Sequence, residues 1–166
     1  MVAEGGNLGF TQLGRVEYAL KGGRINTDAI DNSAGVSCSD HEVNIKILLR
    51  AVDLSLEQRN RLLAEMTDEV AALVLRDNYF QTQSLSISGV LAPSLLDAQE
   101  RFIKSLEKAG RLNRALEFLP NDEEFAERRA AKQGLTNPER AVLLAYSKIA
   151  LNEELLASNV PDDPFI

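Results

Sequence analysis

The chain has 166 residues, of which 45% are hydrophobic and 26% charged, and its net charge is −7. This composition is typical of one soluble globular domain, or of a small domain joined to part of another. An excess of acidic groups repels phosphate backbones, so we expect no nucleic-acid partner. No apolar run reaches the ~18 residues that cross a bilayer, and the N-terminus lacks the features of a signal peptide. We therefore expect no membrane partner and a cytoplasmic location.

The N-terminal part of the chain predicts a strand, a helix and a second strand. Residues 1–3 are typical of the end of a buried parallel strand, and residues 4–7 follow as a glycine loop. Apolar side chains at helical spacing predict a helix over residues 11–22, which the glycine pair at 22–23 ends. Residues 25–30 then form a short strand. The two loops of this βαβ unit leave the carboxyl ends of parallel strands, where open α/β sheets bind their ligands.

Small polar residues follow the second strand and surround a glycine, in the segment Asp31-Asn32-Ser33-Ala34-Gly35. A helix is expected to begin after them, near Ser39. Small side chains let a ligand approach the backbone, and the first turn of a helix offers unbonded N–H donors. This segment is therefore the best candidate for a ligand site. From the residues alone, Asn32 can equally be a turn residue and Ser39 an N-cap.

The remainder of the chain is predicted to be helical. Capping residues or prolines mark four helix starts: Ser55 with Gln58, Pro93, Asn121, and Thr136 with Glu139. The first of these helices continues to about residue 84, as one element or two, and Gly110 and Gly134 are expected to end two others. The predicted fold is mainly α. Residues 1–50 form the last βαβ unit of an incomplete Rossmann-like domain, and residues 51–166 form a C-terminal helical bundle.

Two motifs in this chain resemble the end of the NAD-binding domain of glutamate dehydrogenases. Val2-Ala3-Glu4-Gly5-Gly6-Asn7 is similar to the V-A-E-G-A-N of that family, and the stretch from Asn32 to Glu42 is similar to its N-A-G-G-V-x-V-S-x-x-E. The run D-N-S-A-G-V-S-C-S-D-H-E-V-N-I-K-I-L-L most closely resembles the very large bacterial NAD-specific type. Later phrases, G-L-T-N-P-E and A-Y-S-K, extend the resemblance over most of the chain.

The resemblance implies an oxidative deamination of L-glutamate to 2-oxoglutarate and ammonia, with NAD as the cofactor. Asn7 matches an asparagine that lies against the bound nucleotide, and Asn32 matches one close to the nicotinamide end. Gly35 would keep the backbone low beside the cofactor. Val36 matches the apolar residue against the carbon chain of the substrate, and Ser39 the hydroxyl that binds its distal carboxylate.

The resemblance also implies what this chain does not carry. The catalytic lysine and the acid–base aspartate of the family belong to a substrate domain, and no segment here is similar to it. We therefore expect no catalytic residue and no metal site in these 166 residues. Because the chain is expected to begin inside the cofactor domain, it should be an inactive fragment by itself. The parent enzyme is expected to be a homo-oligomer.

Two other functions are compatible with the residues. The first is a stand-alone helical protein-interaction module, in which the first fifty or so residues pack onto the bundle. The second is a small thiol enzyme, because Cys38 and His41 are three residues apart and would share one face of a helix. The same pair could be part of a metal site, but further ligands in clear register are missing. Rapid alkylation of Cys38 at neutral pH would distinguish the thiol enzyme.

Overall fold

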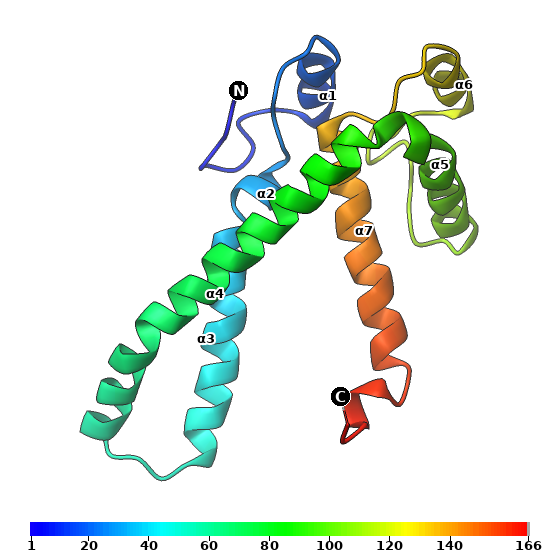
Figure 1. The fold of residues 1–166 in the computed structure, drawn as a ribbon. Helices are drawn as coiled ribbons and strands as arrows, with labels where there is room; N and C mark the ends of the chain where they lie inside the picture. The colour runs from blue at the N-terminus through cyan, green and yellow to red at the C-terminus, as the bar shows by residue number, and fades with distance from the viewer. Residues whose placement is uncertain (166) are drawn as a thin grey trace. The chain divides into compact units, whose positions relative to one another are not determined.

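The computed structural model describes residues 1–165, and these residues contain helices and no β-strand. Figure 1 shows the order of the elements: α1 (Gln12–Leu20), α2 (Asp28–Asp31), α3 (Ser33–Ala51), α4 (Leu56–Val90), α5 (Ala92–Lys108), α6 (Asp122–Ala130), α7 (Asn137–Leu156) and a 3-10 turn, η1 (Val160–Asp162). The mainly α fold is thus confirmed. No helix in the described part of the chain combines the length and the apolar character needed to cross a membrane.

The chain divides into two compact units, and the boundary falls within α4. One unit, here called the core unit, contains residues 1–2, 10–27 and the chain from residue 85 onward. The other, here called the hairpin unit, contains residues 3–9 and 28–84, including α2, α3 and most of α4. The division predicted at residue 50 concerns the domains of a longer protein and stays a prediction.

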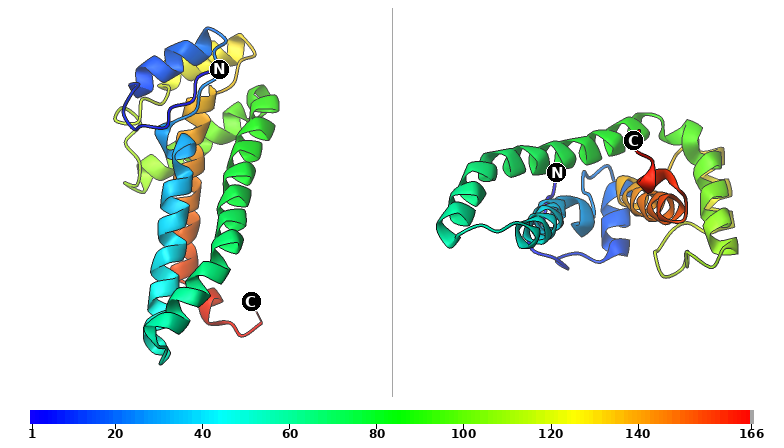
Figure 2. Two further views of the ribbon diagram at one scale, coloured as in Figure 1. Left: turned by 90° about the vertical axis from the view of Figure 1, so that its left-hand side faces the viewer. Right: turned by 90° about the horizontal axis from the view of Figure 1, so that it is seen from below.

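The core unit is organised around apolar side chains of α5, α6 and α7. α1 packs against α7 and α5 packs against α6 (Figures 1 and 2). Their buried residues form one cluster with those of the connecting segments: Leu96, Ile103, Leu106, Leu112, Leu119, Phe125, Leu135 and Leu143. From α7, Leu143 belongs to this cluster and Val142 and Tyr146 pack against it, whereas Ile149 is exposed. This cluster gives the unit a hydrophobic core.

Several helix starts follow the predicted capping chemistry. Ser55 accepts a hydrogen bond from the Gln58 N–H at 3.2 Å, and the Gln58 side chain accepts one from the Ser55 N–H at 2.9 Å. Asn121 and Glu124 exchange the same two bonds at 2.9 and 2.8 Å. Pro93 lies in the first turn of α5. These bonds satisfy backbone donors that a helix start otherwise leaves free.

The start of α7 contains a buried ion pair in addition to its predicted cap. The Glu139 side chain is only 1% exposed and accepts hydrogen bonds from the N–H and the hydroxyl of Thr136, both at 2.6 Å. Both terminal nitrogens of Arg128 donate to the same carboxylate, at 2.7 and 2.8 Å. One carboxylate therefore joins the end of α6 to the start of α7.

The predicted strands are the main error in the sequence-based fold. Residues 1–3 and 24–27 have no regular secondary structure, and one backbone hydrogen bond joins them, from the Val2 N–H to the Arg24 carbonyl at 2.8 Å. Residues 28–31, the expected end of the second strand, form helix α2. A pair of short parallel strands needs further neighbours in a sheet to be stable. The part of the chain that the structure describes offers none.

Other helix boundaries also differ from prediction. α3 begins at Ser33, six residues before Ser39, and α4, which the sequence left open as one helix or two, is a single helix that continues to Val90. Residues 114–118 form turns between α5 and α6. α6 ends at Ala130, where Lys132 takes a left-handed φ of 54°, so Gly134 does not stop it. Gly134 permits a close approach, because a Cβ there would lie 2.3 Å from the backbone carbon of Ala92.

Candidate functional site

The two loops predicted to meet do lie together, within the hairpin unit. The amide nitrogen Nδ2 of Asn32 donates to the side-chain oxygen of Asn7 at 3.0 Å and to the backbone carbonyl of Glu4 at 3.2 Å. Asn7 is exposed and Asn32 is half-buried. These bonds use Nδ2 of Asn32 and Oδ1 of Asn7, and they leave Oδ1 of Asn32 and Nδ2 of Asn7 for another partner. The pair therefore presents one acceptor and one donor.

The short helix α2 holds the glycine loop through its two carboxylates. Asp31 accepts a hydrogen bond from the Glu4 N–H at 3.1 Å, and Asp28 accepts one from the Leu8 N–H at 2.9 Å. Leu8 has a φ of 68°, in the left-handed region that a non-glycine residue rarely adopts. Loop residues 4–8 are therefore fixed by contacts with α2. The sequence analysis did not single out Asp28, since a strand was expected where α2 lies, and it included Asp31 in the candidate segment without this contact.

The start of α3 is supported by a residue of α4. The Ser33 hydroxyl lies 3.0 Å from the Ile30 carbonyl and also contacts the side-chain oxygen of Asn78. The Asn78 nitrogen Nδ2 donates to the Val74 carbonyl at 2.8 Å, which fixes the orientation of its amide. Asn78 of α4 therefore contacts the residue at which α3 begins.

Four of the five residues assigned from the resemblance share one stripe of α3. Asn32 precedes the helix, and Gly35, Val36 and Ser39 follow at the three-, four- and seven-residue spacing that brings side chains to one face. Val36 is 66% exposed, and Ser39 is also exposed. An added Cβ at Gly35 would meet nothing within 4 Å. The stripe is therefore accessible, and folding alone does not require a glycine in it.

The structure corrects one reason for choosing Ser39. We expected this serine near a helix start, where the positive end of the helix dipole favours a carboxylate. α3 begins at Ser33, so Ser39 is neither an N-cap nor part of the first turn. The dipole acts mainly within the first turn of a helix. What remains for Ser39 is an exposed hydroxyl on the same stripe as Asn32.

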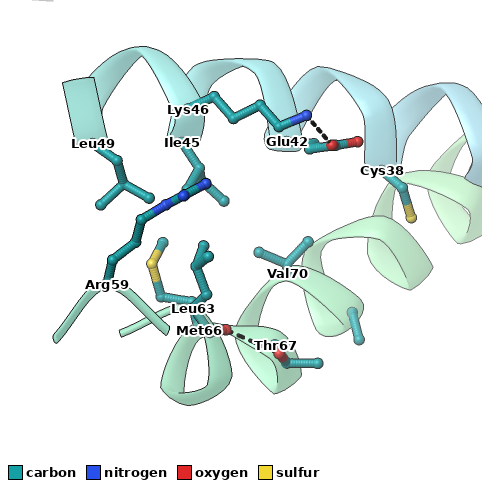
Figure 3. A pocket seen from close by; sticks show the side chains of 11 residues that line it. Cys38, Glu42, Ile45, Lys46, Leu49, Arg59, Leu63, Met66, Thr67 and Val70 are labelled. Carbon is teal, nitrogen blue, oxygen red and sulfur yellow. Dashed lines mark hydrogen bonds and ion pairs between the residues drawn. The ribbon is translucent and has the colours of Figure 1, made fainter. Parts of the chain in front are cut away.

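α3 and α4 enclose a cleft within the hairpin unit (Figure 3). The cleft has a volume of about 400 Å³ and is mostly apolar, with Ile45 and Leu49 from α3 facing Leu63, Met66 and Val70 from α4. Glu42 and Lys46 form an ion pair above it, and the hydrogen bond from Lys46 lowers the pKa of Glu42. Val36 and Ser39 are not among the residues that line this cleft.

Cys38 and His41, the two residues that suggested a thiol enzyme, do not line the same cleft. Cys38 is exposed and lines one end of the cleft, whereas His41 is not among the residues that line it. Among residues 1–165, no group of three or more His, Cys, Asp or Glu side chains is placed to hold a metal ion. The polar groups that do converge are those of the Asn7 and Asn32 loops.

Comparison with known proteins identifies the family. Residues 1–88 match the model described as the catalytic domain of bacterial NAD-glutamate dehydrogenase, and residues 132–166 match the C-terminal part of glutamate dehydrogenase. The chain is thus part of the glutamate dehydrogenase class of proteins. More narrowly, it belongs to the bacterial NAD-glutamate dehydrogenase family, which confirms the resemblance seen in the two motifs.

Relatives with the same name match along almost the whole chain. The chain is 57% identical to the NAD-specific glutamate dehydrogenase of Halomonas elongata and 58% identical to that of Pseudomonas aeruginosa, in both cases over 100% of the chain. It is 52% identical to the protein of that name from Mycobacterium tuberculosis over 98% of the chain. In each case the match covers 10% of the relative, so the chain spans about a tenth of the length of these proteins.

Proposed function

We propose that this chain is a segment of an NAD-dependent glutamate dehydrogenase and contributes part of its cofactor and substrate site. The reaction is the oxidative deamination of L-glutamate to 2-oxoglutarate and ammonia, in which bound NAD accepts a hydride from the substrate. The relatives that span the whole chain are named NAD-specific glutamate dehydrogenases. The parent enzyme is expected to be a cytoplasmic homo-oligomer.

The Asn7–Asn32 pair is the observation that carries the cofactor part of this proposal. Asn32 is held by two hydrogen bonds through Nδ2, which orients its oxygen Oδ1 away from those partners. An amide oxygen accepts from a carboxamide or a ribose hydroxyl, and an amide nitrogen donates to them. The pair thus has the donor and the acceptor that the nicotinamide half of NAD requires. Gly35, one turn along α3, leaves room for a ligand close to the backbone.

The outer stripe of α3 supports the substrate part. Val36 offers an exposed apolar surface suited to the carbon chain of glutamate. Ser39 lies three residues further along the helix, and its hydroxyl can donate to the distal carboxylate. A hydrogen bond to a charged group is worth about 1.5–3 kcal/mol, enough to fix the orientation of a small substrate. An exposed valine beside an exposed serine has no evident role in folding.

The reaction centre itself is assigned to other parts of the parent enzyme. Lys46 is the single lysine among residues 28–84 of the sequence, and its amine forms an ion pair with Glu42 beside the cleft. The catalytic lysine is therefore expected from another segment of the parent enzyme. A glycine-rich loop for the pyrophosphate of NAD would also come from another segment.

The proposal is tested with the full-length enzyme that carries this chain. Purified enzyme should reduce NAD in the presence of L-glutamate, and the isolated chain of 166 residues should not. Substituting Asn32 or Ser39 by alanine in the full-length enzyme should change the kinetic constants without unfolding the protein. A full-length enzyme that shows no NAD-dependent oxidation of glutamate would refute the proposed function.

A further inference from the structure

The start of α7 is hydrogen-bonded to the non-helical segment, residues 24–27, that leads into α2. Nδ2 of Asn137 donates to the Ile25 carbonyl at 3.2 Å and contacts the side-chain oxygen of Asn26, 111 residues away in the sequence. The Ile25 residue is only 3% exposed. All of these residues belong to the core unit. The Asn137 amide therefore contacts two consecutive residues, the backbone of Ile25 and the side chain of Asn26.

Neighbouring side chains hold the same segment and orient Asn137. Arg15 of α1 is 2% exposed and donates to the Asn26 carbonyl at 2.8 Å. Gln12, also from α1, reaches the Pro138 carbonyl at 3.4 Å. On the other side, Arg140 donates to Oδ1 of Asn137 at 3.1 Å, which leaves Nδ2 directed at segment 25–26. The amide of Asn137 is thus held in one orientation by its partners.

The backbone continues from residues 25–26 into α2, whose side chains contact the loop that carries Asn7. Asn26 precedes Asp28 by two residues, and Asp28 and Asp31 hold the glycine loop beside Asn7 and Asn32. The match to the catalytic-domain model covers residues 1–88, whereas Asn137 lies in the match to the C-terminal model, residues 132–166. The C-terminal part of the protein therefore contacts the segment that precedes α2 in the chain.

We propose that Asn137 is a positioning residue for cofactor binding: it restrains residues 25–26, from which the backbone continues into α2. This inference rests on the proposed function. If Nδ2 no longer donates, segment 24–27 gains freedom, and the enzyme must order that segment each time NAD binds. Cofactor affinity is then reduced, because a protein that is only partly in its binding-competent form binds correspondingly less tightly.

Asn137→Asp is the sharpest variant for a test. Aspartate keeps the size of the side chain and an oxygen that accepts from Arg140. Its second oxygen replaces Nδ2 and therefore faces two acceptors, the Ile25 carbonyl and the Asn26 side-chain oxygen. An aspartate in the first turn also favours a helix start, so α7 itself is not weakened. Asn152→Asp is the matched control, because it makes the same change at an exposed position of the same helix.

Both variants of the full-length enzyme are compared with wild type by hydrogen exchange without NAD and by steady-state kinetics. For Asn137→Asp we expect faster exchange in peptides covering residues 24–32 and a KM for NAD raised roughly five- to tenfold, the equivalent of one to two lost hydrogen bonds. The KM for glutamate should change little, and Asn152→Asp should behave as wild type.

Two results would overturn the inference. One is unchanged exchange in residues 24–32 of Asn137→Asp. The other is a lower melting temperature with an unchanged KM for NAD, which would make Asn137 a purely structural residue. A wild-type enzyme that does not oxidise glutamate would instead refute the proposed function, and the exchange experiment would still show whether Asn137 restrains segment 24–27.

Discussion

Nδ2 of Asn32 donates a 3.0 Å hydrogen bond to the side-chain oxygen of Asn7, which lies 25 residues earlier in the sequence. The contact joins the loop before α1 to the start of α3. Each amide keeps one polar group for another partner, so the pair behaves as a single recognition element. A substitution at either residue should therefore disturb the contact of the other with a ligand.

Asn32→Ala in the full-length enzyme should raise the KM for NAD and lower kcat. The alanine removes a ligand contact and releases Asn7, and a misplaced nicotinamide ring disturbs hydride transfer directly. Steady-state kinetics at saturating glutamate measures both constants. Asn44→Ala is the control, since Asn44 is exposed on α3 and bonds only to the Asp40 carbonyl. A loss of thermal stability with normal NAD kinetics would make Asn32 a turn residue without a ligand role.

Ser39→Ala should weaken the apparent affinity for glutamate more than the affinity for NAD. The lost bond to a carboxylate is worth about 1.5–3 kcal/mol, or roughly a ten- to hundredfold rise in KM. Ser37→Ala tests a neighbouring serine of the same helix that lies outside the stripe. Glutamate kinetics that are identical for wild type and Ser39→Ala would remove Ser39 from the site.

Gly35→Ala separates a requirement for folding from a requirement for a ligand. An added Cβ would have nothing within 4 Å, and alanine is favoured over glycine inside a helix by about 1 kcal/mol. The variant should therefore unfold at the same or a slightly higher denaturant concentration. Its KM for NAD should nevertheless rise, because the methyl group occupies space that the cofactor needs. If NAD kinetics are unchanged, Gly35 does not lie beside the cofactor.

Glu139→Gln should destabilise the protein strongly without acting on the site residues. The variant keeps the shape of the side chain but leaves the Arg128 guanidinium facing a neutral group in a buried position. Removing one partner of a buried ion pair costs about 3–5 kcal/mol. Denaturant unfolding should show a large fall in the midpoint. Asp97→Asn, which breaks an exposed pair with Arg129, is the control and should change the midpoint little.

Local signals in the sequence predicted the helical part well. Capping boxes at Ser55 and Asn121 and the proline at residue 93 mark observed helix starts. Gly22 and Gly110, with φ of 84° and 67°, follow helix ends as expected. These features depend on residues close together in the chain, so a single sequence contains them. The two family motifs are local in the same sense.

Features that depend on distant residues were harder to predict. Residues 25–30 have the composition of a strand, but a strand also needs neighbours, and α2 forms over Asp28–Asp31 instead. The start of α3 was expected near Ser39, because the small residues before it suggested a loop. Ser33, where α3 begins, contacts Asn78, which is 45 residues away, and a contact over that distance cannot be predicted from a local sequence pattern. The stripe of Asn32, Gly35, Val36 and Ser39 became visible only with the correct helix start.

Calorimetric titration with NAD tests most directly whether this chain holds part of a site and not a whole one. We predict that the full-length enzyme binds NAD, that its Asn32→Ala variant binds NAD more weakly, and that the isolated chain of 166 residues shows weak or no binding. The reason is that the pyrophosphate-binding glycine loop would lie outside the chain. Micromolar binding of NAD by the isolated chain, or equal affinities of wild type and Asn32→Ala, would contradict this account.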